Sequence, residues 1–529
     1  MSSNSSNSDL PQPANLAVPE LKVDSLKFGI IFALALTAIQ RIVGLVRGIL
    51  FCRLLPEEQL GQWSLTWSYL MLLAPLAVLG LPGSFNRYVE MYRQSGQLKA
   101  FLYRITGISI VMTILFSVVM FMFAETFAGW LYRDTQQTRL ILVMALCLVL
   151  VTAFNFLTSL LEALRQVRLV TAMRFFNGIA FAALAIGLIF CWDNGTEAVT
   201  IGFALSCIVG IIPAIWYFSK NRGVIGDSSQ PLPQKTMWSR VAPFAVWLWV
   251  SNLVTNLYEV ADRNMLLHLA PVSPTDAQAM VGQYHSGRII PLVLVGLAAM
   301  LSGILMSYIT ASWERGEKEK VSQQLRWTLK LMGLGFTFVG AGVLLVSPLL
   351  FDVVLQGKFN DGLAVLPLTL VYCIWYSLLT VGQDYLWCRE KGKWACLAIL
   401  LGLTANVALN FVLIPRIGLN GAVWATAISN LIALVSLYLI NRHFGWIPDT
   451  GIWLTVLVPL VLLLPINLAV ACVLFVSWAG FKYRLLFNES ECQELIESCE
   501  SLKQKVQICL LYTSPSPRDL STSRMPSSA

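Results

Sequence analysis

The chain has 529 residues, of which 57% are hydrophobic and only 12% are charged. A soluble domain normally carries about twice that charged fraction, so the composition excludes a soluble protein. Continuous apolar runs of roughly 20 residues exclude a transmembrane β-barrel, whose strands alternate polar and apolar residues, and predict membrane-spanning helices. The net charge of +8 does not indicate nucleic-acid binding, because most basic residues lie in loops between the apolar runs.

The chain begins with a Ser-, Asn- and Pro-rich segment, residues 1–24, that we expect to be a disordered cytoplasmic N-terminus. It lacks the short apolar core and cleavage site of a signal peptide. Two sets of apolar runs follow, and a polar cytoplasmic linker at 220–240 divides them. The fold class is therefore predicted to be all-α, a polytopic membrane protein with two pseudo-symmetric six-helix bundles, 25–219 and 241–441, and 12–14 transmembrane helices in all.

The individual spans follow from the positions of the apolar runs. Those expected in the first half are 26–50, 60–84, 100–124, 139–162, 169–192 and 197–218. Those expected in the second half are 241–267, 282–309, 327–350, 363–387, 394–415 and 418–440.

The distribution of lysine and arginine predicts a cytoplasmic N-terminus. With that orientation, the cytoplasmic segments contain most of the basic residues, as the positive-inside rule requires. The basic residues expected in outer loops are few: Arg53, Arg133, Arg139, Lys358 and Arg416. We therefore expect an integral protein of the plasma (inner) membrane.

Beyond the second bundle, the apolar segment 451–480 allows two interpretations. A single crossing would place Lys482 and Arg484 outside, against the positive-inside rule, whereas an extra hydrophobic hairpin of two short helices would return them to the cytoplasm. The hairpin is favoured because each half is too short for an ordinary span. Residues 481–509 predict an amphipathic cytoplasmic tail, and 510–529 resemble a non-native read-through tail.

The two halves carry related motifs. Arg47–Pro56 is followed by Leu60-Gly61-Gln62-Trp63, and Arg263–Pro271 is followed by Val281-Gly282-Gln283-Tyr284. Each copy indicates the end of one spanning helix, a turn marked by proline, and the start of the next helix. A duplicated membrane bundle is typical of a carrier whose halves move about a central substrate site.

Ionisable side chains within the spans are costly in a bilayer, so each requires a reason. Arginine binds phosphate oxygens through two parallel hydrogen bonds and keeps its charge when partly desolvated. We therefore expect a cationic, substrate-binding cavity that takes a phosphate- or pyrophosphate-bearing cargo. Its candidate residues are Arg41, Arg47, Arg263 and Arg288. An alternative for Arg47 and Arg288 is that they extend to the lipid headgroups.

The seventh span supplies candidates for coupling or gating. A helical spacing of i, i+4, i+7 and i+11 places four residues on one polar stripe, Asn252, Asn256, Glu259 and Arg263, and Asp262 directly precedes the last of them. These groups could bind a coupling proton or sodium ion, or they could form a structural network between the halves.

Hinge candidates are Gly44, Gly48, Pro75 and Pro82, where the first two spans can bend. Close helix packing is an equally good explanation for each glycine. We expect no catalytic residue, metal site or cofactor: the 11 cysteines are scattered singly, there are three histidines, and no nucleotide-binding loop of the GxxxxGK[ST] form occurs.

From residue 25 to about 480, the chain resembles the MOP exporter superfamily in its polysaccharide-biosynthesis branch of O-antigen translocase-like flippases. The resemblance rests on the two Gly-Gln-aromatic motifs and on Asn406-Val-Ala-Leu-Asn410, followed by Pro415-x-x-Gly418 and Gly421-Ala422-Val423. It implies alternating access about a central cationic cavity. The implied substrate is a polyprenyl-pyrophosphate-linked oligosaccharide, flipped from the inner to the outer leaflet without enzymatic chemistry.

The resemblance also implies membrane lipids, a coupling ion (H⁺ or Na⁺) and polysaccharide-assembly proteins as partners. A lipid II flippase and a cation-coupled multidrug exporter of the same superfamily remain open as alternatives. A membrane glycosyltransferase is disfavoured because the outer loops are short.

Overall fold

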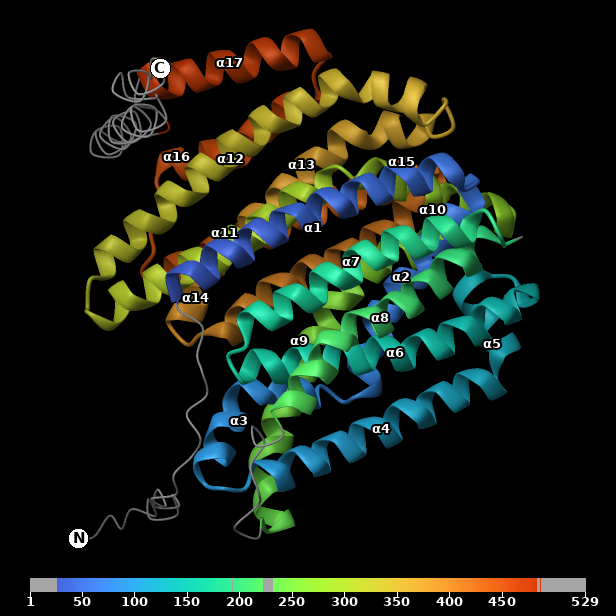
Figure 1. Ribbon diagram of the computed structural model, residues 1–529. Coiled ribbons are helices and arrows are strands. Elements are labelled where there is room, and N and C mark those ends of the chain that lie inside the picture. Colours follow the sequence, from blue (N-terminus) through green and yellow to red (C-terminus); the bar gives the residue numbers. More distant parts are fainter. Residues whose placement is uncertain (1–25, 193, 222–231, 483–485, 487–529) are drawn as a thin grey trace, which may run out of the picture.

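The computed structural model describes residues 26–192, 194–221, 232–482 and 486. Every regular element within these residues is a helix, and most helices run alongside one another (Figure 1). Helices are expected because a chain in lipid must satisfy each backbone N–H and C=O group internally. The predicted disordered N-terminus, nearly all of the predicted amphipathic tail and the predicted read-through tail lie outside the described residues.

The first half contains one continuous succession of helices. They are α1 (Leu26–Leu54), α2 (Glu57–Ala77), η1 (Leu81–Ser84), α3 (Phe85–Gln94), α4 (Leu98–Met122), α5 (Ala124–Tyr132), η2 (Thr135–Gln137), α6 (Thr138–Ala163), α7 (Val167–Ile189) and α8 (Gly195–Lys220). Helix α7 packs along α8 and α1, and α6 packs along α8 and α4.

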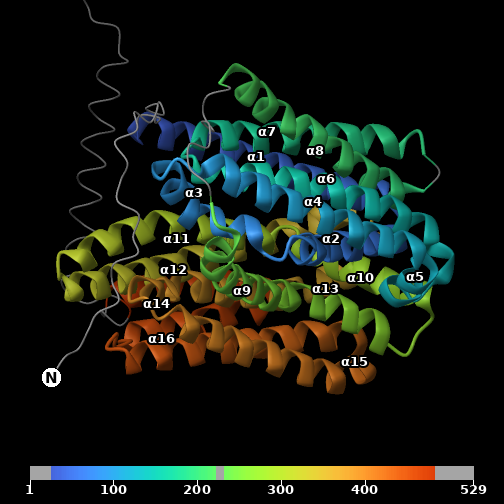
Figure 2. The same cartoon turned by 90° about the horizontal axis from the view of Figure 1, so that it is seen from below.

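The second half begins after the linker and repeats this arrangement. Its helices are α9 (Gln234–Leu269), α10 (Pro274–Arg288), α11 (Pro291–Glu314), α12 (Lys318–Leu349), the π-helical turn η3 (Leu350–Val354), α13 (Asn360–Gly382), α14 (Asp384–Cys388) and α15 (Gly392–His443). Figure 2 shows the halves as two layers, with α1, α4, α6, α7 and α8 in one and α11 to α16 in the other.

Eight helices among the described residues are long and apolar enough to cross a membrane, or nine if the bent pair of 57–77 and 81–94 forms one span. The expected number of spans is larger because α15 includes two of them and because α1 and α9, which carry the spans predicted at 26–50 and 241–267, are not among these helices. Ile417 and Gly418 depart from helical geometry inside α15, and Gly418 has a φ of +54°, so the predicted Pro415-x-x-Gly418 turn separates the spans there. Similarly, α10 and α11 divide the span predicted at 282–309.

The second span bends by 64° between α2 and the helical segment 81–94. The bend contains two residues with positive φ, Leu79 at 52° and Gly80 at 65°. A side chain at Gly80 would also come within 2.9 Å of the Cβ of Trp249 on α9, so both the backbone and the packing favour glycine.

The last helices that the structure describes form a hairpin against α12. Its parts are α16 (Thr450–Leu457), the 3₁₀ helix η4 (Val458–Leu463) and α17 (Ile466–Lys482). All three pack on α12, and the N–H of Leu486 bonds the carbonyl of Gly480 at 3.4 Å. Since the carbonyl oxygen of Leu486 also lies against Gly451, the second helix returns to the end where the first began. The apolar segment 451–480 thus forms the two short helices that the sequence favoured.

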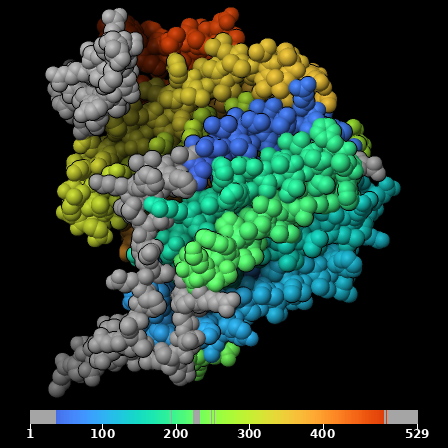
Figure 3. Space-filling view, viewed as in Figure 1, coloured from blue at the N-terminus to red at the C-terminus, as the bar shows by residue number. Residues whose placement is uncertain are grey.

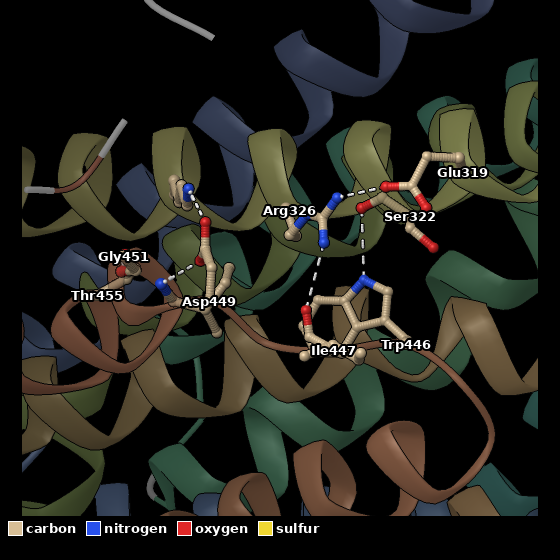
Figure 4. Close-up of polar contacts among 10 residues, drawn as sticks. Glu319, Ser322, Arg326, Trp446, Ile447, Asp449, Gly451 and Thr455 are labelled. Atoms are coloured by element: carbon tan, nitrogen blue, oxygen red, sulfur yellow. Dashed lines mark hydrogen bonds and ion pairs between the residues drawn. The ribbon is translucent and has the colours of Figure 1, made fainter. Parts of the chain in front are cut away.

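Polar contacts fix the segment before this hairpin to α12 (Figure 4). The ammonium group of Lys330, a fully buried residue, lies 2.5 Å from a carboxylate oxygen of Asp449. The other oxygen of Asp449 accepts the N–H of Ile452 at 2.9 Å and so caps α16. Arg326 bonds the carbonyl of Ile447 at 3.4 Å, and the indole N–H of Trp446 bonds the carbonyl of Ser322 at the same distance.

Large apolar side chains remain exposed along the outward faces of several helices, as expected for surfaces that face lipid tails. On α4, α7 and α8 they include Ile110, Val111, Phe176, Ile208 and Ile212. Helices α7 and α8 form neighbouring green ridges on the face shown in Figure 3.

Candidate functional site

The two copies of the Gly-Gln-aromatic motif pack against each other where α2 crosses α10. A Cβ atom on Gly61 would overlap the carbonyl of Gln278, and a Cβ atom on Gly282 would overlap the carbonyl of Glu57. The two backbones are therefore in direct contact, which only glycine permits at these positions. The motif that indicated a duplication from the sequence is thus the place where the halves meet.

The glutamines of the two motifs have similar positions. Gln62 donates to the side-chain oxygen of Gln278 at 2.9 Å, across the two halves, and accepts from the hydroxyl of Thr196 on α8 at 3.0 Å. Gln283 accepts the N–H of Gly362 on α13 at 3.0 Å. Each glutamine therefore ties its helix to another helix of its own half.

Further hydrogen bonds join the halves at this same end of the bundle, where α1 ends and α2 begins. They run from Gln278 to the carbonyl of Tyr132 (2.7 Å), from Arg133 to the carbonyl of Leu267 (2.9 Å) and from Lys358 to the carbonyl of Arg53 (3.1 Å). This end is closed in the present conformation.

The halves also touch near the opposite end, through α3 and α9. The hydroxyl of Tyr88 donates to the carbonyl of Arg240 at 2.9 Å, and the guanidinium of Arg87 lies 4.8 Å from the ring centroid of Phe244. Because α3 follows the bend after α2, a change in that bend would move these contacts.

The first two candidate arginines lie on different sides of α1. Arg41 is exposed, and its guanidinium lies against Gly296 of α11, where an added Cβ would be 2.8 Å from Nη1. Arg41 therefore reaches the second half. Arg47 is half-buried, and its guanidinium carbon lies 4.1 Å from the ring centroid of Phe181 on α7, a cation–π contact within the first half.

The other two arginines also divide in this way. Arg263, 4% exposed, donates to the hydroxyl of Ser68 on α2 and so bridges the halves. Arg288 is buried within the second half, where its guanidinium carbon lies 5.1 Å from the ring centroid of Tyr284 and 5.9 Å from that of Tyr372. The four arginines thus do not form a single cluster: Arg41 and Arg263 reach across, and the other two remain within their own halves.

Asp262 is the centre of a buried polar network inside the second half. Its carboxylate accepts hydrogen bonds from Asn406 (2.7 Å), Asn410 (3.1 Å), Thr426 (2.7 Å) and Tyr284 (3.0 Å). These donors come from α10 and from both spans of α15. These four hydrogen bonds offset the free-energy cost of removing the carboxylate from water and burying it inside a membrane protein.

A cavity of about 20 Å³ adjoins this carboxylate, enough for one water-sized species. Arg288, Thr426 and Asn430 contribute to its lining along with Asp262. Among the described residues, the side-chain oxygens of Asn410 and Asn430 have no hydrogen-bond partner. The lining of the cavity therefore includes the carboxylate of Asp262, the amide of Asn430 and one guanidinium, whereas Asn410 bonds the carboxylate without lining the cavity.

The other coupling candidates lie apart from this network. Asn252 is exposed, and Asn256 donates to the backbone carbonyl of Asn252 at 2.8 Å, within α9. Glu259 lies on α9, but its side chain is outside the described part of the structure. Sequence reasoning found Asp262 and missed the donors around it. Asn406 and Asn410 carried a usable signal, since two amides four residues apart in an apolar helix share one face.

The hinge candidates fall into two groups. Helix α1 is continuous through Gly44 and Gly48; a Cβ on Gly48 would lie 3.1 Å from Ile289, the residue after α10, so this glycine also serves close packing. Pro75 lies inside α2 and Pro82 in η1, on either side of the 64° bend. Bending during transport remains a prediction for all four.

Comparison with known proteins agrees with this architecture. The family model described as polysaccharide biosynthesis protein matches residues 26–306. The lipid II flippase MurJ of Bacillus subtilis (strain 168) is 22% identical over 447 residues, which cover 78% of this chain and 81% of that protein.

Two solved structures are similar in fold. One is the lipid II flippase MurJ in an inward closed conformation, with a TM-score of 0.66, 15% identity, and coverage of 86% of this chain and 99% of that one. The other is an inward-facing multidrug resistance MATE family transporter of the MOP superfamily, with a TM-score of 0.64, 14% identity, and coverage of 78% and 97%. The duplicated helical bundle and the family match over more than half of the chain lead to one conclusion: this chain belongs to the polysaccharide biosynthesis protein family, and its fold is similar to that of transporters of the MOP superfamily.

Proposed function

We propose that this protein flips a polyprenyl-pyrophosphate-linked oligosaccharide from the inner to the outer leaflet of the plasma membrane by alternating access, for cell-surface polysaccharide biosynthesis such as that of O-antigen or lipopolysaccharide. The observation that carries the proposal is the pair of arginines, Arg41 and Arg263, that extend from one half to the other. A guanidinium between two moving halves can bind a pyrophosphate in one conformation and release it in the next. No covalent step is needed, so the protein acts as a carrier rather than an enzyme.

The conformation described above supports a particular direction of transport across the membrane. If the N-terminus is cytoplasmic, as the lysine and arginine distribution predicts, the end closed by Gly61 and Gly282 is the outer end. The cargo would then bind from the cytoplasmic side, and separation of α2 from α10 would release it outside. On this proposal the bundles at 25–219 and 241–441 are the two moving units, and the linker at 220–240 joins them in the cytoplasm.

Coupling is proposed to run through Asp262. Its carboxylate and the amide oxygen of Asn430 are oxygen ligands of the kind that a hard cation such as sodium prefers, and the carboxylate is also the group there that a proton would bind. The guanidinium of Arg288 lies in the same cavity and repels a cation. Entry of the ion would therefore require Arg288 to move, and this movement would connect ion binding with a rearrangement of α10.

Two alternatives within the superfamily make different predictions. A lipid II flippase is favoured by the 22% identity to MurJ, and it too would require cationic groups for a pyrophosphate. A cation-coupled multidrug exporter is favoured only by fold similarity. The arginines that bridge the halves argue against a cationic drug as cargo, because like charges repel.

The deciding experiment measures flipping by the purified protein in liposomes. The cargoes are a polyprenyl-pyrophosphate oligosaccharide, lipid II and a cationic dye. We compare the wild type with Arg41→Ala, Arg41→Lys and a control, Arg416→Ala, which removes an exposed arginine from the turn within α15. The proposal expects oligosaccharide flipping that Arg41→Ala abolishes, that Arg41→Lys restores in part and that Arg416→Ala leaves unchanged.

Each other result identifies a competing function. Flipping of lipid II but not of the other glycolipid would assign the protein to peptidoglycan precursor transport. Export of the dye, dependent on Na⁺ or pH and indifferent to Arg41, would assign it to the multidrug exporters.

A further inference from the structure

The second half contains another buried carboxylate, apart from Asp262. It belongs to Asp384, the first residue of α14, and this residue is only 4% exposed. Figure 1 shows α14 beside α11, at the end of the molecule where α1 begins. Asp384 lies eight residues, or about 12 Å, further along the chain than Tyr376, the last residue of α13 that lines the cavity beside Asp262. The two carboxylates therefore belong to different sites.

A break in the helix positions this acid. Helix α13 ends at Gly382 and α14 begins at Asp384, so the span is interrupted between them. The carbonyl of Gly382 accepts a hydrogen bond from the side chain of Asn441 at 3.0 Å, and the hydroxyl of Tyr385 donates to the carbonyl of Phe444 at 2.9 Å. Both partners lie at the end of α15, so α14 is fixed to that helix.

The side chain of Asp384 faces a different helix, α11. Its Oδ1 atom accepts a hydrogen bond from the hydroxyl of Ser302 at 2.9 Å. One turn later, the thiol of Cys388 donates to the carbonyl of Ile309, also on α11, at 3.8 Å. The Oδ2 atom of Asp384 is buried and has no hydrogen-bond partner among the described residues. The contact between α11 and α14 thus contains a carboxylate of which only one oxygen is bonded.

No positive charge near α14 neutralises this carboxylate. Arg389 follows α14, but its guanidinium carbon lies among aromatic rings, 5.5 to 5.8 Å from the ring centroids of Trp313, Tyr385 and Phe444. The charged or basic side chains of the three helices packed against α14 are few and exposed: Glu314 on α11, Asp361 on α13, and Lys393, Arg416, Arg442 and His443 on α15. None of them forms an ion pair with Asp384 in the part of the chain that the structure describes.

A proton is the ligand that suits this environment. Burial without a neutralising cation disfavours the charged form of a carboxylate, and protonation removes the charge. A bound proton requires no additional ligand and no cavity. A sodium ion would require several oxygen ligands, whereas the structure places a single side-chain oxygen, that of Ser302, on this carboxylate.

We propose that Asp384 is a proton-binding site that holds α11 against α14. In the present conformation the carboxyl group keeps its proton, because the packing of α11 excludes the water that would solvate the ion. When α11 moves away, the O–H bond breaks, the proton passes to water and the electron pair stays on the carboxylate. Since the closed contact favours the protonated form, the contact is stable at low pH and weakens as the pH rises. The site goes beyond the proposed function, and its tests need no transport assay.

Infrared difference spectroscopy of the full-length protein in nanodiscs tests whether Asp384 carries a proton. We expect the C=O stretching band of a protonated carboxylic acid at neutral pH and its loss in alkaline buffer. Asp384→Asn should remove this band, Asp384→Glu should shift it, and the control Asp361→Asn, which removes an exposed acid from the same span, should leave it unchanged. A band that Asp384→Asn leaves unchanged would overturn the proposal. A band that sodium removes at constant pH would also overturn it, because the site would then bind sodium.

The thiol of Cys388 reports whether the proton controls the contact with α11. The measurement is its rate of maleimide labelling against pH, in a background without the other native cysteines. Asp384→Asn carries the same thiol and serves as the reference, so the general rise of thiol reactivity with pH cancels in the ratio of the two rates. We expect the ratio of wild type to Asp384→Asn to rise several-fold between acidic and alkaline buffer, and Asp361→Asn to behave as the wild type. A constant ratio would show that the proton on Asp384 does not hold the two helices together.

Discussion

At the scale of single residues, Asp262 connects several helices that are distant from it in the sequence. It belongs to α9, yet its hydrogen-bond donors come from α10 and from both spans of α15. A change at this one carboxylate would thus affect three helices. Its neighbour Arg263 points the other way, to Ser68 of the first half. Adjacent residues therefore connect the interior of the second half with the surface it shares with the first.

Asp262→Asn is expected to reduce transport at least roughly tenfold while the protein still folds. The amide retains the shape of the acid but loses the charge, and charge-assisted hydrogen bonds are about twice as strong as neutral ones. The measurement is initial flipping rate against sodium concentration and pH. Asn252→Ala is the control, because Asn252 is exposed on the same helix. A rate in Asp262→Asn that keeps the wild-type dependence on both ions would remove Asp262 from coupling.

Lys330→Met is expected to destabilise the protein by roughly 3–5 kcal/mol, because it leaves Asp449 without its buried partner. Changing both residues, Lys330→Met with Asp449→Leu, should recover part of that loss. The comparison uses thermal unfolding in detergent, with Lys320→Met as a control for an exposed lysine of the same helix. If the single and double variants unfold at the same temperature as the wild type, this ion pair does not hold the hairpin.

At the scale of helices, the crossing of α2 and α10 sets how closely the halves can approach. Gly61→Ala is expected to destabilise the closed end by about 1–3 kcal/mol, because the added methyl group overlaps the carbonyl of Gln278. We would measure hydrogen exchange at the start of both helices, with Gly107→Ala on α4 as the control, since nothing lies within 4 Å of a Cβ there. If the amides of Gly61→Ala exchanged as slowly as those of the wild type, the added methyl group would not weaken the contact between α2 and α10, and the prediction would be wrong.

The helices could largely be predicted from the sequence, because apolar runs long enough to span a bilayer leave the chain few alternatives to a helix. The Pro415-x-x-Gly418 turn and the pair of short helices at 451–480 were predicted for the same reason. The break between α10 and α11 was not, since Ile289 and Ile290 continue the apolar pattern and only Pro291 marks a new helix.

The candidate site could be predicted only in part. The free-energy cost of placing an ionisable side chain in a bilayer marks these residues as candidates, but it does not say what each one contacts. Arg47 and Arg263 are the same type of residue, and both lie in predicted spans. Yet the guanidinium of Arg47 stacks on the ring of Phe181, whereas that of Arg263 donates to the hydroxyl of Ser68. These partners depend on how helices distant in the sequence are rotated about their axes. Local periodicity carries no information on that rotation.

At the scale of the whole molecule, transport requires the closed end to open. A short, reducible thiol crosslinker between Gln62→Cys and Gln278→Cys, two positions whose native side chains are hydrogen-bonded across the halves, is expected to hold that end shut and stop flipping in a background without the native cysteines. Reduction should restore the rate to that of the uncrosslinked double variant. The check is a flipping assay before and after reductant, with Gly107→Cys and Gly303→Cys as a pair too far apart to link. Full activity in the crosslinked protein would mean that cargo leaves without separation of α2 and α10.

The contact between Gly61 and Gly282 also bears on the history of the chain. Each glycine occupies the same place in its own repeat, and each leaves room for the backbone of the other repeat. A substitution that added a side chain to either glycine would place that side chain against the backbone of the other repeat. If one ancestral half once paired with itself, the same surface would have served both partners, and the need for glycine would have been inherited twice. The rest of the two halves could then diverge freely, while this one meeting point retained the imprint of a symmetric dimer.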